Sequence, residues 1–123
     1  MNSKKKIRKK FRNETFERDN YKCRLCGADF SSQEHPELFL DAHHITDRNE
    51  MPNGGYVKEN GISLCKENLD EETGGIVESC HMKAERFHIS GGEEWLDGAH
   101  PDDLYAMIGS SKELAILMSE KLK

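Results

Sequence analysis

The sequence has few apolar residues and no long apolar run. Hydrophobic residues make up 35% of its 123 residues and aromatic residues 7%, whereas charged residues make up 33%. A chain of this length suits a single domain, but so small an apolar share would give that domain a thin core. We therefore expect a structural metal to help hold the fold.

The missing apolar run also argues against a transmembrane helix, which needs about 20 consecutive apolar residues. The charged N-terminal stretch is not followed by the apolar segment of a secretory signal, so we expect a cytoplasmic protein. In a reducing compartment, the four cysteines of the chain favour metal ligation or free thiols over disulfides.

Positive charge is concentrated near the N-terminus, although the whole chain has a net charge of −5. Residues 1–26 contain ten Lys or Arg and three acidic residues, whereas the remainder contains 8 basic and 20 acidic residues. The basic end favours contact with a polyanion, and a solubilising tail is the alternative that composition allows. We expect residues 1–5 to be a disordered basic arm and residues 6–123 to form one domain.

Apolar spacing and turn residues predict an α+β domain. We expect helices over residues 7–17, 80–88, 101–108 and 112–122, and strands over 38–45 and 61–65. A polar, turn-rich segment joins the two strands, and an acidic loop with a Gly74–Gly75 turn follows the second strand. Ser110 or Ser111 is expected to cap the last helix.

The four cysteines form two half-sites. Cys23 and Cys26 enclose two residues and precede a glycine, which is the form of a zinc knuckle, whereas fourteen residues separate Cys65 from Cys80. Four thiolates make a closed tetrahedral Zn²⁺ site, and the longer loop adds little closure entropy. We expect one structural zinc bound by all four cysteines. The alternative is one occupied half-site and two buried thiols.

A second set of polar residues, His43, His44, Asn60 and His81, follows in a fixed order. The stretches RDNYKCRLCG, LDAHHI, GGYVKENGISLC and CHMKAE together resemble the HNH endonuclease family. They cover most of residues 18–88, a little over half the chain. The resemblance implies a ββα-metal (HNH/His-Me finger) core stapled by the four-cysteine site and flanked by N- and C-terminal helices. It also implies hydrolysis of nucleic-acid phosphodiester bonds with one divalent cation.

By position, the resemblance implies that His43 is a metal ligand, His44 the general base and His81 the metal ligand of the helix. Asn60 would brace the long hairpin loop through side-chain to backbone hydrogen bonds, or bind the metal as in some relatives. A neutral histidine suits the deprotonation of water, and a divalent cation suits the charge that develops on the phosphate. Neighbouring strand residues point to opposite faces, so the adjacent histidines can divide these tasks.

A further ligand is expected on the helix. Glu85 lies four residues after His81, where many HNH relatives have a histidine, and shares a helix face with it. His88 is the alternative, but it lies roughly 10 Å along the axis from His81, against roughly 6 Å for Glu85. The carboxylate of Glu85 favours Mg²⁺ or Mn²⁺ over Zn²⁺ as the catalytic metal. Asp41 shares the strand face of His43 and either supports the metal site or is an exposed acid.

Together these features predict a metal-dependent HNH endonuclease acting on DNA, expected to be double-stranded, in a bacterial or phage-infected host cell. The motif core would span residues 18–90, followed by a helical extension over 91–123. One alternative is a non-catalytic zinc module that binds nucleic acid or a protein partner. Another is a nuclease active only beside a partner, as in a viral packaging or restriction complex.

Overall fold

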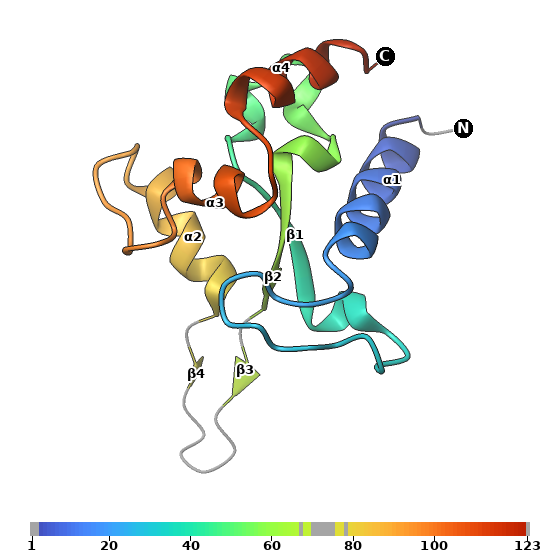
Figure 1. Cartoon of the computed structure of the whole chain (residues 1–123), viewed down its shortest axis with the longest axis vertical. Coiled ribbons are helices and arrows are strands. Elements are labelled where there is room, and N and C mark those ends of the chain that lie inside the picture. Colours follow the sequence, from blue (N-terminus) through green and yellow to red (C-terminus); the bar gives the residue numbers. More distant parts are fainter. Residues whose placement is uncertain (1–2, 67, 70–75, 78, 123) are drawn as a thin grey trace.

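The chain folds into a small α+β domain built around one β-hairpin (Figure 1). The computed structural model describes residues 3–66, 68–69, 76–77 and 79–122. Its helices are α1 (Ser3–Arg18), α2 (Cys80–Ile89), α3 (Pro101–Met107) and α4 (Lys112–Glu120). Its antiparallel strand pairs are β1 (Leu40–His44) with β2 (Gly61–Cys65), and β3 (Asn68–Leu69) with β4 (Ile76–Val77). No helix in these ranges is long and apolar enough to cross a membrane.

The predicted elements are present, with shifts at their ends. β2 has the predicted bounds, whereas β1 begins at Leu40 because Pro36–Leu38 form a single 3₁₀ turn. Residues 3–5 are helical where a disordered arm was expected, since α1 begins at Ser3 and the basic stretch contains no helix-breaking residue. The predicted Gly74–Gly75 turn lies outside the described residues.

Serine and histidine side chains set the starts of the later helices. Ser79 Oγ accepts a hydrogen bond from Met82 N at 3.1 Å and so caps the start of α2. The helix therefore begins at the adjacent residues Cys80 and His81. Ser111 caps α4 as predicted, by accepting from Leu114 N at 3.1 Å. His100 caps α3 through Nδ1.

The hairpin lies between α1 and α2 (Figure 1). His43 pairs with Ile62 and His44 with Gly61, so the two histidines stand at the end of the hairpin where the long loop 45–60 begins. At Gly61, an added Cβ would lie 2.6 Å from both Phe11 Cε1 and Thr15 Oγ1. Glycine is required there because α1 lies directly against the backbone of β2.

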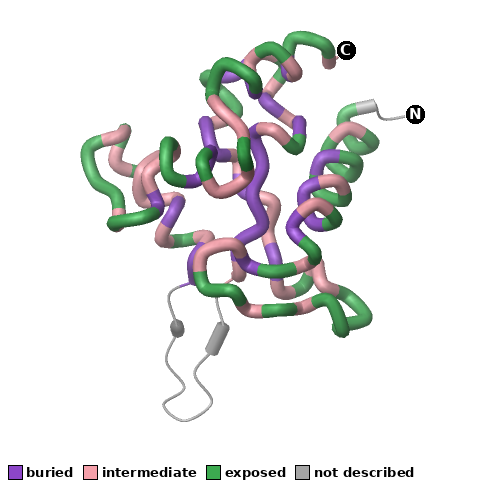
Figure 2. The backbone as a smooth tube through the Cα atoms, in the orientation of Figure 1, coloured by how far each residue is buried: buried purple, intermediate pink, exposed green. Residues whose placement is uncertain are grey.

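The core is small and surrounds β2, which is buried along most of its length (Figure 2). α1 turns its buried residues toward the hairpin. The apolar cluster joins residues from β1, β2, the hairpin loop and all four helices, including Phe16, Leu40, Ile45, Ile62, Ala84, Leu104 and Ala115. One layer of side chains therefore connects all the major elements.

A buried carboxylate links four parts of the chain. Asp19 has a fully buried side chain and accepts hydrogen bonds from Arg18 Nε and Nη2 at 2.8 Å, from Arg24 Nη1 at 3.0 Å and from Ser63 N at 2.9 Å. The same arginines reach further: Arg18 Nη2 donates to Gly61 O at 2.7 Å and Arg24 Nη2 to Met107 O at 2.5 Å. The end of α1, the cysteine knuckle, β2 and α3 are held at this point.

Replacing Asp19 by Asn should destabilise the protein strongly. The amide cannot accept the four hydrogen bonds, and it leaves two guanidinium groups without their counter-charge, so we expect a loss of about 3 kcal/mol in the free energy of unfolding. Urea denaturation would measure the loss. Glu17→Gln, an exposed change in the last turn of α1, should leave stability within ~0.5 kcal/mol. Equal midpoints for both variants would contradict the importance of the Asp19 contacts.

Candidate metal centres

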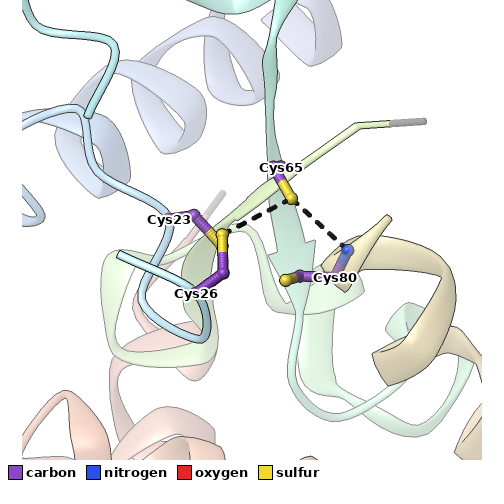
Figure 3. A group of neighbouring side chains, drawn as sticks. All are labelled: Cys23, Cys26, Cys65 and Cys80. Carbon is purple, nitrogen blue, oxygen red and sulfur yellow. Dashed lines mark hydrogen bonds between the residues drawn. The ribbon is translucent and has the colours of Figure 1, made fainter. Parts of the chain in front are cut away.

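The four cysteines converge although three separate segments carry them (Figure 3). The Sγ atoms of Cys23, Cys26, Cys65 and Cys80 lie within 4.8 Å of one another, and none forms a disulfide. The separation between Cys26 Sγ and Cys65 Sγ is 3.9 Å. Tetrahedral zinc with Zn–S bonds of about 2.3 Å places its sulfurs roughly 3.8 Å apart. The predicted single four-cysteine cluster is therefore confirmed, and it could bind a structural zinc.

The surroundings of the cluster suit thiolates that share a cation. The pKa of Cys23 is lowered: burial opposes this shift, but hydrogen bonds from the backbone of Cys26, Cys65 and Leu25 outweigh it. The pKa values of Cys65 and Cys80 are raised by burial and by the neighbouring cysteines. A dication would remove this repulsion, because bound cysteines are deprotonated.

The two adjacent histidines of β1 point to opposite sides of the hairpin, as strand geometry requires. His43 is buried and faces α2, where its Nδ1 lies 3.1 Å from Glu85 Oε1. His44 faces α1 and packs against the rings of Phe11 and Tyr56, with centroid distances of 4.6 and 4.7 Å. The prediction that the pair divides between two faces is confirmed by these contacts.

His43, Glu85 and His88 form a second group with the geometry of metal ligands. Each offers one ligand atom, and these atoms lie within 4.8 Å of one another. The 3.1 Å contact between His43 and Glu85 is not aligned as a hydrogen bond, since His43 Nδ1 has no hydrogen-bond partner. Donor atoms that share one cation typically lie ~3 Å apart while pointing at a common centre. The group could thus hold a metal ion.

His88 is oriented for this role by the backbone of β1. Its Nε2 lies 3.0 Å from the carbonyl oxygen of His44, which can only accept a hydrogen bond. Nε2 therefore carries the proton, and the lone pair of the neutral ring is on Nδ1. A backbone carbonyl commonly fixes a ligating histidine in this way. Sequence spacing favoured Glu85 over His88, but the structure brings both to His43.

His81 lies beside the group but outside the mutually close set. Its Nε2 is 3.4 Å from Glu85 Oε1, and its Nδ1 is 3.1 Å from Asp41 Oδ2. Burial opposes protonation, but the two carboxylates raise the pKa of His81 to about 9. Contacts with His43 and His81 hold the pKa of Glu85 well below its usual value. Asp41, which lies on the strand face of His43, is thus a direct partner of His81.

His44 is held in a neutral state. Burial and the neighbouring His43 lower its pKa to about 4, and its Nε2 is buried without a hydrogen-bond partner. A neutral imidazole with an unoccupied nitrogen can accept a proton. Phe11 and Tyr56 fix the plane of the ring.

Asn60 is fully occupied as a brace of the hairpin loop. Its Oδ1 accepts from Thr46 N at 3.0 Å and Tyr105 Oη at 2.7 Å, and its Nδ2 donates to Thr46 O at 3.1 Å and Gly55 O at 3.2 Å. An added Cβ at Gly55, where φ is +67°, would lie 2.7 Å from Asn60 Nδ2. The bracing role implied by the family resemblance thus matches these contacts, and no side-chain atom of Asn60 is left for a metal.

Some partners of these residues were not identified from the sequence. No sequence pattern linked Asn60 to Tyr105 on α3, or His44 to Phe11 on α1 and Tyr56 in the loop. Each aromatic residue is separated from its partner by many positions in the chain. The approach of His88 to His43 could have been predicted from the sequence. Residues 81, 85 and 88 follow the i, i+4, i+7 spacing of one helix face.

Comparisons of the chain with protein-family models, curated proteins and solved structures gave no match. The likeness to the HNH family therefore rests on the order of the motifs, the clustered cysteines and the hairpin with its helices.

Zinc should copurify with the protein and contribute to its stability. We expect one zinc per chain by elemental analysis in the absence of other added metals. Cys26→Ser should abolish that zinc and lower the melting temperature by about 10 °C or more, because metal binding and folding are coupled. Ser32→Ala, in an exposed loop, serves as the control. Full zinc content in Cys26→Ser would show that the four-cysteine assignment is wrong.

Asn60→Asp should be much more damaging than its small change in shape implies. The carboxylate cannot donate to Thr46 O and Gly55 O, so we expect the free energy of unfolding to fall by about 3 kcal/mol. The same substitution at the exposed Asn13 should be nearly neutral. Urea denaturation of both variants compares the two sites, and a neutral Asn60→Asp would rule out the bracing role.

Proposed function

We propose that this chain is a metal-dependent endonuclease of the HNH type that hydrolyses phosphodiester bonds in DNA. The observation that carries the proposal is the convergence of His43, Glu85 and His88 where the hairpin meets α2. It is supported by the HNH-like order of motifs and by the nearby four-cysteine cluster, which would hold the start of α2 against the hairpin.

The donor set fits a divalent cation. His43 and His88 would supply nitrogen ligands and Glu85 an oxygen ligand, with His81 held next to Glu85 by Asp41. Like the predicted set, this group offers two imidazole nitrogens and one carboxylate, and the two nitrogens favour Mn²⁺ over the oxygen-seeking Mg²⁺. When bound, the cation would supply positive charge for the phosphate oxygens and the leaving oxygen.

His44 would accept the proton of the attacking water. Its pKa near 4 keeps it neutral at physiological pH, and a phosphodiester arriving beside it would favour the protonated ring, because an anion raises the pKa of a neighbouring histidine. Phe11 and Tyr56 keep the imidazole in one orientation. His44 is separated from the metal-ligand group by the strand itself, so the substrate would have to pass the end of β1 where both histidines lie.

The same packing favours a second candidate function. Because His44 is enclosed by Phe11 and Tyr56 rather than turned toward Glu85, the protein could instead be a zinc-stabilised module that binds nucleic acid without cutting it. A nuclease that needs a partner would also bind without cutting when alone, but addition of the partner would restore cleavage.

A plasmid cleavage assay tests the proposed nuclease. With Mn²⁺ or Mg²⁺, the wild type should nick or linearise supercoiled DNA. His44→Ala should lower the rate by roughly 10²- to 10⁴-fold while metal binding is retained, since a general base contributes about that much. His43→Ala should instead weaken metal binding, seen by calorimetric titration of the zinc-loaded protein.

His35→Ala is a suitable control because that side chain is 60% exposed, and its ion pairs among the described residues are with the neighbouring Glu34 and Glu37. It should cut DNA at the wild-type rate. Equal rates for the wild type and His44→Ala would exclude the role given to His44. Binding without cleavage under every divalent metal would favour the non-catalytic module.

A further inference from the structure

A cavity with a cationic lining lies between α1 and the hairpin loop, on the His44 side of β1. Its volume is about 260 Å³. Lys4 and Arg8 line it from α1, and Arg48, Asn53 and Tyr56 line it from the loop. No acidic side chain is among its described lining residues. Arg8 and Arg48 thus face one hollow that no carboxylate lines, with Asp47 acting on Arg48 from outside the lining, and a bound anion would relieve the repulsion between the two guanidinium groups.

Tyr56 organises this cavity. Arg48 Nη1 lies 3.4 Å from Tyr56 Oη, and the guanidinium carbon of Arg8 lies 5.6 Å from the centre of the Tyr56 ring. Partial burial opposes ionisation of the phenol, but the two arginines lower the pKa of Tyr56, which reflects the positive potential at the hydroxyl. The two guanidinium groups therefore meet around one ring.

The loop side of the cavity is fixed to the rest of the fold. Asn53 adopts a left-handed conformation with φ of +52°, and its Nδ2 donates to Ser119 O at 3.0 Å and Leu122 O at 2.9 Å. Tyr56 also packs on Phe11, with a centroid distance of 5.7 Å. The cavity is thus preformed, and little ordering would be needed when a ligand binds.

The positive surface continues along α1 beyond the cavity. Lys4, Lys5, Arg8, Lys9 and Arg12 line a neighbouring hollow of about 420 Å³. The residues at positions 4, 8 and 12 follow the spacing of a single helix face. An extended anion with regularly spaced charges would fit this row of cations better than a small isolated anion.

We propose that Arg8, Arg48 and Tyr56 form a binding site for one backbone phosphate of a nucleic acid. The guanidinium groups would make charge-assisted hydrogen bonds to the phosphate oxygens, and the Tyr56 hydroxyl would donate to them. The ring of Tyr56 contacts His44 at 4.7 Å between centroids, so this phosphate would anchor the strand beside the proposed general base. The choice of nucleic acid as ligand rests on the proposed function.

Fluorescence anisotropy with a labelled 20-base-pair duplex tests the site. The zinc-loaded full chain is titrated without added Mg²⁺ or Mn²⁺, so that binding is measured apart from cleavage. Arg8→Gln and Arg48→Gln should each weaken binding by about tenfold and reduce the salt dependence by about one released ion. Tyr56→Phe should weaken binding less, since only the hydroxyl is lost.

Lys10→Gln is the matched control, because it removes one charge from the same helix at a residue that lines a different hollow. It should weaken binding by less than ~2-fold. Unfolding midpoints are recorded for every variant, and Arg48→Lys, which retains the charge without the planar fork, should bind between Arg48→Gln and the wild type. If both Arg→Gln variants bind like Lys10→Gln, the site is overturned.

Competition separates a backbone phosphate from a free one. Inorganic phosphate should displace the duplex no better than chloride at equal ionic strength. Specific displacement that is lost in Arg8→Gln would assign the site to free phosphate and overturn the proposal. The proposed nuclease can fail separately: an inactive wild type whose duplex binding still depends on Arg8 and Arg48 would leave this site standing. An active enzyme whose duplex affinity is unchanged by Arg8→Gln and Arg48→Gln would overturn this site but not the proposed nuclease.

Discussion

The rest of the structure depends on the hydrogen bonds and ion pairs that the buried carboxylate of Asp19 forms. A charge removed from water must be paired, and Asp19 is paired by Arg18, Arg24 and the backbone N–H of Ser63. Each arginine then uses its remaining donors on carbonyl groups of other segments, including Gly61 O and Met107 O. Because the core contains few apolar side chains, these directed contacts, together with the cysteine cluster, define how the segments meet.

That framework places β1 between two chemically different surfaces. On one face, His43 meets the polar side of α2, with its carboxylate and histidines. On the other face, His44 meets the aromatic rings of Phe11 and Tyr56, backed by the basic helix α1. Strand alternation is enough to place the rings of His43 and His44 on opposite faces. The close approach of α1 to the strands also requires glycine at position 61, which pairs with His44. The difference between the two histidines therefore comes from the helices that cover them.

Much of this arrangement was predictable, because it depends on local patterns. Apolar spacing located β2, a capping serine located the start of α4, and cysteine spacing predicted a single cluster. The pairing of Asp41 with His81 and the hydrogen bond from Tyr105 to Asn60 were not predicted. Such contacts join residues 40 or more positions apart, and their geometry is set by packing, which a single sequence does not encode in any short motif. At the N-terminus the local pattern was misinterpreted. The basic composition suggested disorder, but the helix propensity of these residues extends α1 to Ser3.

The distribution of charge over the fold suggests how a polyanion would approach it. The hairpin carries the histidines at its loop end, where β1 meets the loop 45–60. The cations of α1 and Arg48 border the loop end, so the field there can remain attractive although the whole chain is acidic. A nucleic acid attracted by these cations would meet the hairpin at the end of β1 that bears both His43 and His44.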